Sequence, residues 1–259
     1  MFADNPTPLD LHFRLFGFPI RVSPWFWLVS ALLGDFILRQ FGLLYLLVWI
    51  ACVFVSILLH ELGHAFAARW FGSTARIDLI AFGGLASYPH PPRAGWRRML
   101  IALAGPAAGF SFAGIIYGSD VAARWRESSD FALRAYSFLL WINLFWNCIN
   151  LLPIWPLDGG KVCREVVYMA GARNPDAVAY AVSMVAAGLL TVWGVLVATG
   201  NEPRWLVENS PFAPSLYMTL WFGLFAVQSY LLLQEANRQA AWGKPHADED
   251  DDRLPWERR

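Results

Sequence analysis

Long apolar stretches without charge recur along the chain, and they predict helices that cross a membrane. Because a bilayer core is about 30 Å thick, a crossing helix needs about 20 apolar residues. Four stretches meet this requirement, a fifth is interrupted only by asparagines, and the first is shorter and contains Asp35. In chain order they are residues 22–38, 41–59, 99–118, 135–152, 177–200 and 212–234. We therefore expect an all-α, polytopic membrane protein with about six transmembrane helices.

The distribution of positive charge predicts the orientation of these helices. Six crossings would place both termini, the second-to-third connection and the fourth-to-fifth connection on one side, together with 15 of the 20 lysines and arginines. Because cytoplasmic loops carry the excess of positive charge, both termini are expected in the cytoplasm, with a prokaryotic cell membrane as the expected location. The organisation is then a cytoplasmic segment (1–21), a transmembrane core (22–235) and an acidic, disordered tail (236–259).

Composition supports a membrane protein and excludes other classes. Only 15% of residues are charged while 57% are hydrophobic, and the mean hydropathy is +0.40, which argues against a soluble globule. The net charge of zero offers no basic surface for nucleic acid. The three cysteines are too far apart in sequence to predict disulfides or a metal site. Asp4 and Pro6 lie where a signal peptide would need a basic and then an apolar run, so no cleavage is expected.

The second apolar stretch continues past Leu59 with an H-E-x-x-H pattern, His60-Glu61-Leu62-Gly63-His64. Residues four apart project from nearly the same helix face, so both imidazoles could bind one Zn²⁺. Glu61 would lie beside the metal without binding it, placed to take a proton from a zinc-bound water. Ionisable groups inside a membrane helix are costly, which favours a functional site over a structural polar patch.

A catalytic zinc usually has three protein ligands, so one more must come from elsewhere. The candidates are His12, His90, Asp35, Asp78 and Asp158. His60 lies nine residues before Arg69, about 14 Å along a helix, which puts the metal in the cytoplasmic half of the membrane. Asp158 follows the fourth crossing in the same leaflet, whereas Asp35 is at the wrong end of the first. His12, His90 and His246 show no metal-ligand spacing and are expected in loops.

The segment around Asp158 reads Asn-Leu-Leu-Pro-Ile-Trp-Pro-Leu-Asp-Gly-Gly over residues 150–160. Its two prolines break the helix, and Gly159 and Gly160 free the backbone. This lets the carboxylate turn back toward the helix bundle.

Together these motifs resemble the site-2 proteases, intramembrane zinc metalloproteases of peptidase family M50, over residues 18–167. Gly83-Gly84 and Gly105-Pro106 also fit. The resemblance implies that His60, His64 and Asp158 bind one Zn²⁺ per chain and that Glu61 is the general base. It implies a polar role at the reacting carbonyl for Asn150. Since the chain shows neither a PDZ nor a nucleotide-sensing CBS domain, we expect the minimal form of the family.

Glycines in the third apolar stretch and asparagines in the fourth lead to further expectations. The third stretch contains two G-x-x-x-G pairs, at 105/109 and 114/118, which predict close helix approach. In the family an Asn often stands at the position of Gly109, so this stretch receives no catalytic role. Asn143, Asn147 and Asn150 share one helix face, where the first two are expected to form interhelical hydrogen bonds. Asn150 could stabilise the oxyanion.

Residues 76–88 contain two short β-favouring runs that meet at Gly83-Gly84, which predicts a small membrane-embedded β-hairpin between the second and third helices. One role for it is to pair with an unwound substrate segment. The other is to seal the site as a membrane-dipping loop, and both stay open.

These features predict an intramembrane zinc endopeptidase that cleaves single-span membrane proteins in or near their transmembrane segment within the bilayer. One alternative is another membrane zincin that draws its third ligand from Glu165, Glu202 or Glu235. A second is a non-proteolytic protein, such as a metal transporter or an inactive chaperone-like relative. No feature predicts an oligomeric state.

Overall fold

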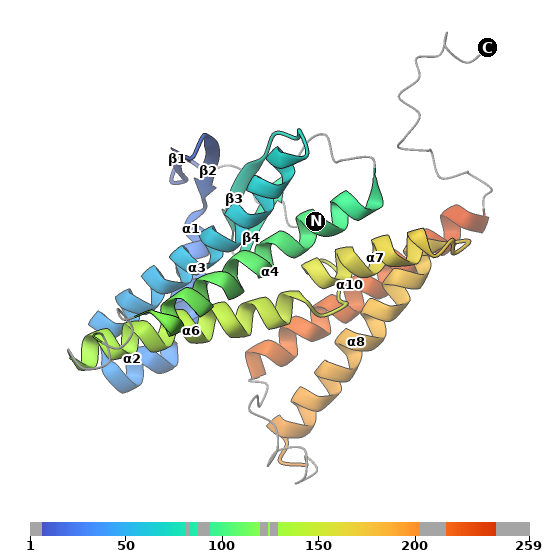
Figure 1. Cartoon of the computed structure of the whole chain (residues 1–259). Helices are drawn as coiled ribbons and strands as arrows, with labels where there is room; N and C mark the ends of the chain where they lie inside the picture. Colours follow the sequence, from blue (N-terminus) through green and yellow to red (C-terminus); the bar gives the residue numbers. More distant parts are fainter. Residues whose placement is uncertain are drawn as a thin grey trace. The chain divides into compact units, whose positions relative to one another are not determined.

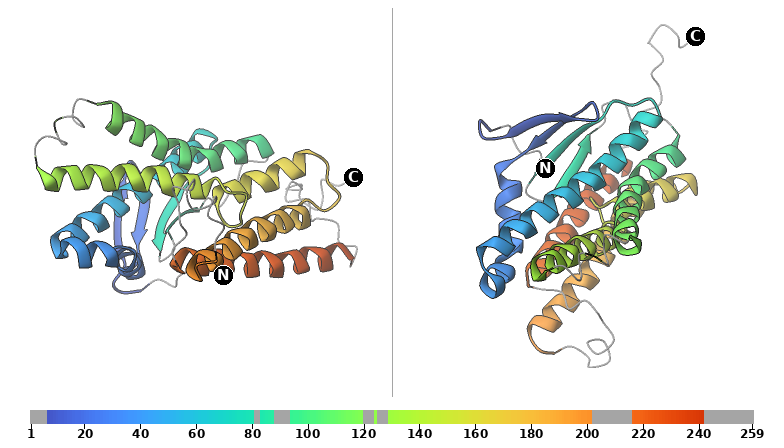
Figure 2. Two further views of the ribbon diagram at one scale, coloured as in Figure 1. Left: turned by 90° about the horizontal axis from the view of Figure 1, so that it is seen from below. Right: turned by 60° about the vertical axis from the view of Figure 1, so that its left-hand side comes forward.

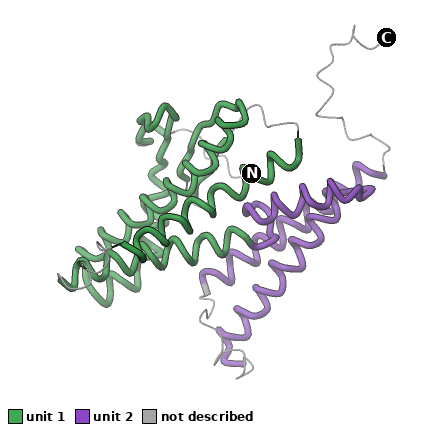
Figure 3. The backbone as a smooth tube through the Cα atoms, in the orientation of Figure 1, with its two compact units in different colours: residues 1–151 green, residues 152–259 purple. Residues whose placement is uncertain are grey.

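The structure is a computed structural model that describes residues 7–80, 83–87, 94–119, 124, 129–201 and 216–241. It divides into two compact units, Met1–Leu151 and Leu152–Arg259 (Figure 3). The first unit holds β1 (Leu11–Leu15), β2 (Phe18–Val22), α1 (Pro24–Leu33), α2 (Asp35–Phe41), α3 (Leu43–Trp70), β3 (Arg76–Ile80), β4 (Gly83–Ser87), α4 (Gly95–Gly118) and α6 (Asp130–Asn150). The second holds α7 (Asp158–Met169), α8 (Pro175–Ala198) and α10 (Leu216–Ala241) (Figure 1).

The fold is mostly helical, as expected, but the first unit contains a four-stranded sheet where only a β-hairpin was expected. Its strand order is β1-β2-β3-β4; β2 and β3 are parallel, and the outer pairs are antiparallel. Strand β1 and nearly all of β2 lie within residues 1–21, which were expected only as an N-terminal segment. The signal was there: apolar residues alternate on both sides of Phe16-Gly17, and both of these residues adopt positive φ in the turn.

Strands β3 and β4, which lie between α3 and α4 in the chain, form an antiparallel pair; the predicted membrane-embedded position of a hairpin there stays a prediction. The register of the pair joins Ile80 to Gly83, and residues 81–82 lie outside the described part. Gly83 and Gly84 therefore begin strand β4 instead of forming the turn.

The sheet packs on α3, the longest helix (Figure 2). Apolar side chains of β2 and β3 join those of α3 in one buried cluster, and α3 is in contact with α4 and α6. The cluster includes Phe18, Ile20, Ile77, Leu79 and Leu62. Burial of these side chains fixes the sheet beside the part of α3 that carries the H-E-x-x-H pattern.

The first predicted crossing, residues 22–38, is not a single helix. It contains the end of β2, then α1 and α2, which are separated at Gly34. A Cβ at Gly34 would lie 2.6 Å from Leu46 Cδ1 and 2.7 Å from Trp49 Cδ1, so the absence of a side chain lets this corner rest on α3. The same contact is strengthened by a hydrogen bond from Trp49 Nε1 to the Ser30 carbonyl, 3.1 Å long.

Within the described residues, three helices are long and apolar enough to cross a membrane: α3, α4 and α8. The fourth and sixth predicted crossings, residues 135–152 and 212–234, correspond to α6 and α10, which are helical as expected. The count of six crossings stays a prediction.

In the second unit, α8 and α10 pack along each other and are joined by polar contacts. Ser183 Oγ and Ser229 Oγ are 2.7 Å apart, and Thr219 lies against Gly194. Ser183 Oγ also accepts from the Trp155 amide, which ties the loop before α7 to α8.

Candidate metal centre

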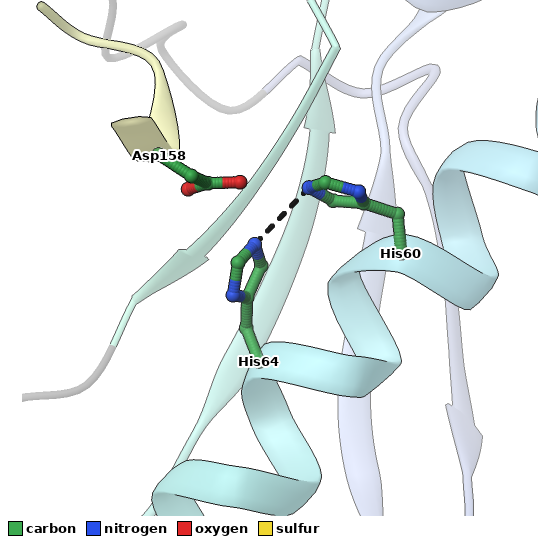
Figure 4. Close-up of side chains that lie close together, drawn as sticks. All are labelled: His60, His64 and Asp158. Atoms are coloured by element: carbon green, nitrogen blue, oxygen red, sulfur yellow. Dashed lines mark hydrogen bonds between the residues drawn. The ribbon is translucent and has the colours of Figure 1, made fainter. Parts of the chain in front are cut away.

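The two histidines of the H-E-x-x-H pattern lie one turn apart on α3, and both are buried. Their Nε2 atoms face each other at 3.1 Å (Figure 4). Because a helix turns about 400° over four residues, this convergence follows directly from the spacing of His60 and His64.

The other ring nitrogen of each histidine is fixed by a neighbouring helix. His64 Nδ1 lies 2.7 Å from the backbone carbonyl of Ile101 on α4. A carbonyl oxygen only accepts, so His64 Nδ1 carries the proton and donates it. His60 Nδ1 lies 2.7 Å from Asn147 Oδ1 on α6. Hydrogen bonds of this kind select the tautomer in which Nε2 is the metal-binding atom.

Asp158 is the first residue of α7 and is also buried. Its Oδ1 accepts a hydrogen bond from Lys161 Nζ at 2.9 Å. Gly160, two residues after Asp158, permits a close backbone contact. A Cβ at this position would lie 2.5 Å from the Ile154 carbonyl oxygen and 2.7 Å from the Trp155 nitrogen. The loop of residues 151–157 can thus lie flat on the start of α7.

His60, His64 and Asp158 form a group that could hold a metal ion, with one ligand atom from each within 4.8 Å of the others (Figure 4). Two imidazole nitrogens and one carboxylate oxygen are the donor set of a catalytic zinc site, which leaves a fourth position for water or substrate. The group therefore fits Zn²⁺ in both the number and the chemistry of its ligands.

Gly105 on α4 provides a second test of that fit. A Cβ at this position would lie 2.8 Å from His60 Nε2 and still nearer to His64 Nε2. A side chain would therefore fill the space onto which the two ligand atoms converge. The absence of a side chain at Gly105 keeps that space open for an ion.

Glu61 directly follows His60 in the chain. It is buried and lies against strand β4. A Cβ at Gly84 would overlap the Glu61 carboxylate and Cγ. The backbone of β4 lies this close to Glu61 because residue 84 has no side chain. Glu61 is not part of the group of His60, His64 and Asp158, and its role as a base stays a prediction.

The three asparagines of α6 are buried on one face, as predicted. Asn143 Nδ2 donates to Ser56 Oγ on α3 at 2.8 Å, the interhelical hydrogen bond expected of it. Asn147 also bonds across helices, but to His60, a contact with a candidate ligand that the sequence did not predict. Asn150 Nδ2 donates to the Trp146 carbonyl at 3.0 Å, and its role at the reacting carbonyl stays a prediction.

Comparison with known proteins assigns the chain to a family. The model of "Peptidase family M50" matches residues 48–125 and 120–193, which is more than half of the chain and includes every residue of the candidate centre. The chain belongs to peptidase family M50.

Two of the following three relatives of this M50 chain carry the name of a zinc metalloprotease. A putative zinc metalloprotease of Synechocystis is 33% identical over 174 residues, covering 62% of this chain and 45% of the relative. A zinc metalloprotease of Methanocaldococcus jannaschii is 28% identical, with 60% and 44% covered. Stage IV sporulation protein FB of Bacillus subtilis is 32% identical, with 55% and 46% covered. The chain thus spans less than half the length of these relatives.

A solved structure shares the fold. The site-2 protease from Methanocaldococcus jannaschii aligns with a TM-score of 0.51 at 20% identity, covering 89% of this chain and 95% of that one. The fold of this site-2 protease is therefore also the fold of this chain.

The remaining ligand candidates of the M50 chain are engaged elsewhere or lie outside the described residues. Asp35 pairs with Arg39 at 2.7 Å, and Asp78 pairs with Arg21 at 3.0 Å. His12 lies on strand β1 instead of in the expected loop. Residues His90, His246 and Glu202 fall outside the described part of the chain.

The two described glutamates that were alternative third ligands, Glu165 and Glu235, are not part of the group of His60, His64 and Asp158. Glu165 is buried on α7, and Glu235 on α10 is exposed and pairs with Arg238 at 3.4 Å. Among the described residues, the one group of three or more potential ligands is that of His60, His64 and Asp158.

Proposed function

We propose that the chain is an intramembrane zinc endopeptidase that hydrolyses a peptide bond in or near the transmembrane segment of membrane-anchored proteins. The observation that carries the proposal is the convergence of His60 and His64 Nε2, with Gly105 keeping the space before them open. Membership of family M50 and the protease names of its relatives support it.

In this proposal His60, His64 and Asp158 hold one zinc ion. When bound, zinc would polarise the scissile carbonyl and make the attacking water more acidic. Lys161, which donates to Asp158 Oδ1, would help to hold that carboxylate in place.

Glu61 is the proposed general base. It would take a proton from the attacking water and later deliver that proton to the leaving amine nitrogen. Its packing against Gly84 would restrict the carboxylate to one position beside the histidines. Asn150 would donate from its amide to the oxygen of the reacting carbonyl, where negative charge develops.

The proposed substrate is a single-span membrane protein, bound as an extended strand. A transmembrane helix hides its peptide bonds, so the substrate has to unwind before hydrolysis. Strand β4 is the last in the sheet order and touches Glu61, which supports strand addition at its outer edge over a loop that only seals the site. A multi-pass protein of a prokaryotic membrane, with both termini in the cytoplasm, is the setting we propose.

The test replaces Glu61 with Gln, which keeps the size of the side chain but removes the base. With a membrane-anchored single-span reporter co-expressed in cells, cleavage by E61Q should fall by about 10²–10⁴-fold, since this is what a general base contributes. Zinc content of the purified protein should not change. The control E235Q alters an exposed glutamate on α10 and should cleave normally.

Equal cleavage by E61Q and the wild type would contradict a proteolytic role. It would instead favour a transporter or scaffold that uses the same fold.

A further inference from the structure

Asn147 on α6 is placed so that only one orientation of its amide is compatible with its neighbours. Its Nδ2 donates to the backbone carbonyl of Asn143, one turn earlier. The reverse orientation would set two oxygens against each other, because a carbonyl accepts and cannot donate. Asn147 Oδ1 must therefore face His60, at 2.7 Å from Nδ1.

This orientation determines the tautomer of His60. An amide oxygen can only accept, so the proton of the hydrogen bond lies on His60 Nδ1. The Nε2 atom is then the ligand atom, and it is the one that faces His64 Nε2. Asn147 is about 1% exposed, so water does not compete for this hydrogen bond.

Gly109 on α4 makes room for the amide. A Cβ at Gly109 would lie 2.7 Å from Asn147 Cγ and 2.8 Å from its Oδ1. Any larger residue would push the amide away from His60. The position that the sequence interpretation excluded from the chemistry thus contributes to it by having no side chain.

We propose that Asn147 is a positioning residue of the metal centre, which holds His60 in its Nδ1-protonated tautomer with Nε2 directed at the zinc, and that Gly109 is required for this placement. The proposal rests on the proposed function, because it assumes that His60 binds zinc. Partners of metal-binding histidines commonly contribute about 10–100-fold to metal affinity.

The experiment measures zinc affinity of the purified full chain by competition with a chelator. In N147L the side chain has similar size but no acceptor, so zinc should bind about 10–100-fold more weakly. N147D restores the acceptor for His60 but loses the donor to the Asn143 carbonyl, so it should bind zinc more tightly than N147L and less tightly than the wild type. G109A displaces the amide without changing Asn147 and should weaken binding too.

The matched control is N143L, one turn away on the same face of α6. It removes an interhelical hydrogen bond of the same kind, to Ser56, but leaves the Asn143 backbone carbonyl that orients Asn147. Its zinc affinity should equal that of the wild type. Thermal unfolding of the zinc-stripped proteins separates loss of affinity from loss of fold.

Wild-type affinity in N147L, or equal weakening in N143L, would overturn the inference while the zinc site itself stands. A wild-type chain that binds no zinc would instead overturn the proposed function, and this inference with it.

Discussion

Two glycines of α4 illustrate how single residues shape the centre through the side chains they lack. Gly105 faces the two histidine Nε2 atoms, and Gly109 faces the amide of Asn147. The G-x-x-x-G pattern predicted close helix approach for both pairs of glycines. At Gly114 and Gly118, no described atom lies within 4 Å of where a Cβ would stand, so close approach is limited to the pair beside the site.

This contrast gives a direct test of the ion position. G105A should remove zinc binding because its methyl group would occupy the space in front of both Nε2 atoms. G114A makes the same change on the same helix, where nothing described is near, and should bind zinc normally. Both variants gain about 0.5–1 kcal/mol of intrinsic helix stability, so G114A also controls for that effect. Zinc content by elemental analysis decides, and full zinc in G105A would place the ion elsewhere.

At the scale of elements, a buried ion-pair network joins the first strands of the sheet to the segment before them. Arg21 on β2 lies 3.4 Å from Asp10 and 3.0 Å from Asp78 on β3. Thr7 donates to Asp10 from its hydroxyl and its backbone amide. Removal of one partner from such a network leaves an uncompensated charge, so the network stabilises the sheet against which Glu61 packs.

The pKa of Asp10 provides a pH-dependent prediction for this element. The hydroxyl of Thr7 holds the pKa of the Asp10 carboxyl below its ordinary value of 3.8. A lowered folded-state pKa means that the carboxylate stabilises the fold above that ordinary value and that this contribution is lost as pH falls through the folded pKa. D10N should therefore lower the Tm at neutral pH, by an amount that shrinks in acid below the ordinary value.

The control for D10N is D35N, which removes an exposed carboxylate paired with Arg39 on the same helix. Exposed pairs of this kind contribute about 0–1 kcal/mol, so D35N should change the Tm little. Thermal unfolding across the acid range measures both variants. A Tm difference for D10N that stays constant into strong acid would refute the assigned role of the carboxylate.

The long helices and the convergence of the two histidines could be predicted from the sequence because both depend on local spacing. Apolar runs identify α3, α4 and α8, and the i, i+4 spacing alone brings His60 and His64 together. The break at Gly34 and the contact of Asn147 with His60 could not be predicted in this way. They depend on which residues of α3, α4 and α6 meet after packing, and that information is not local.

The N-terminal strands were missed for a different reason. The alternation in β1 and β2 is a local signal, but the long apolar runs that follow drew the interpretation toward helices alone. Alternating apolar residues on either side of a two-residue turn with a glycine would have been sufficient to predict this hairpin.

At the scale of the whole molecule, the family and the candidate centre point to the same chemistry. The chain belongs to peptidase family M50 and has the fold of a site-2 protease, and its described residues include three helices long and apolar enough to cross a membrane. Proteolysis of membrane-anchored proteins is the activity that we propose from these features.

The central claim is that His60, His64 and Asp158 hold one zinc ion, and zinc content of the purified chain tests it most directly. The wild type should contain about one zinc per chain. H64A and D158A should lose it, whereas E165Q, which alters the rival buried carboxylate of α7, should keep it. Full zinc in D158A, or loss of zinc in E165Q with D158A unaffected, would contradict the account.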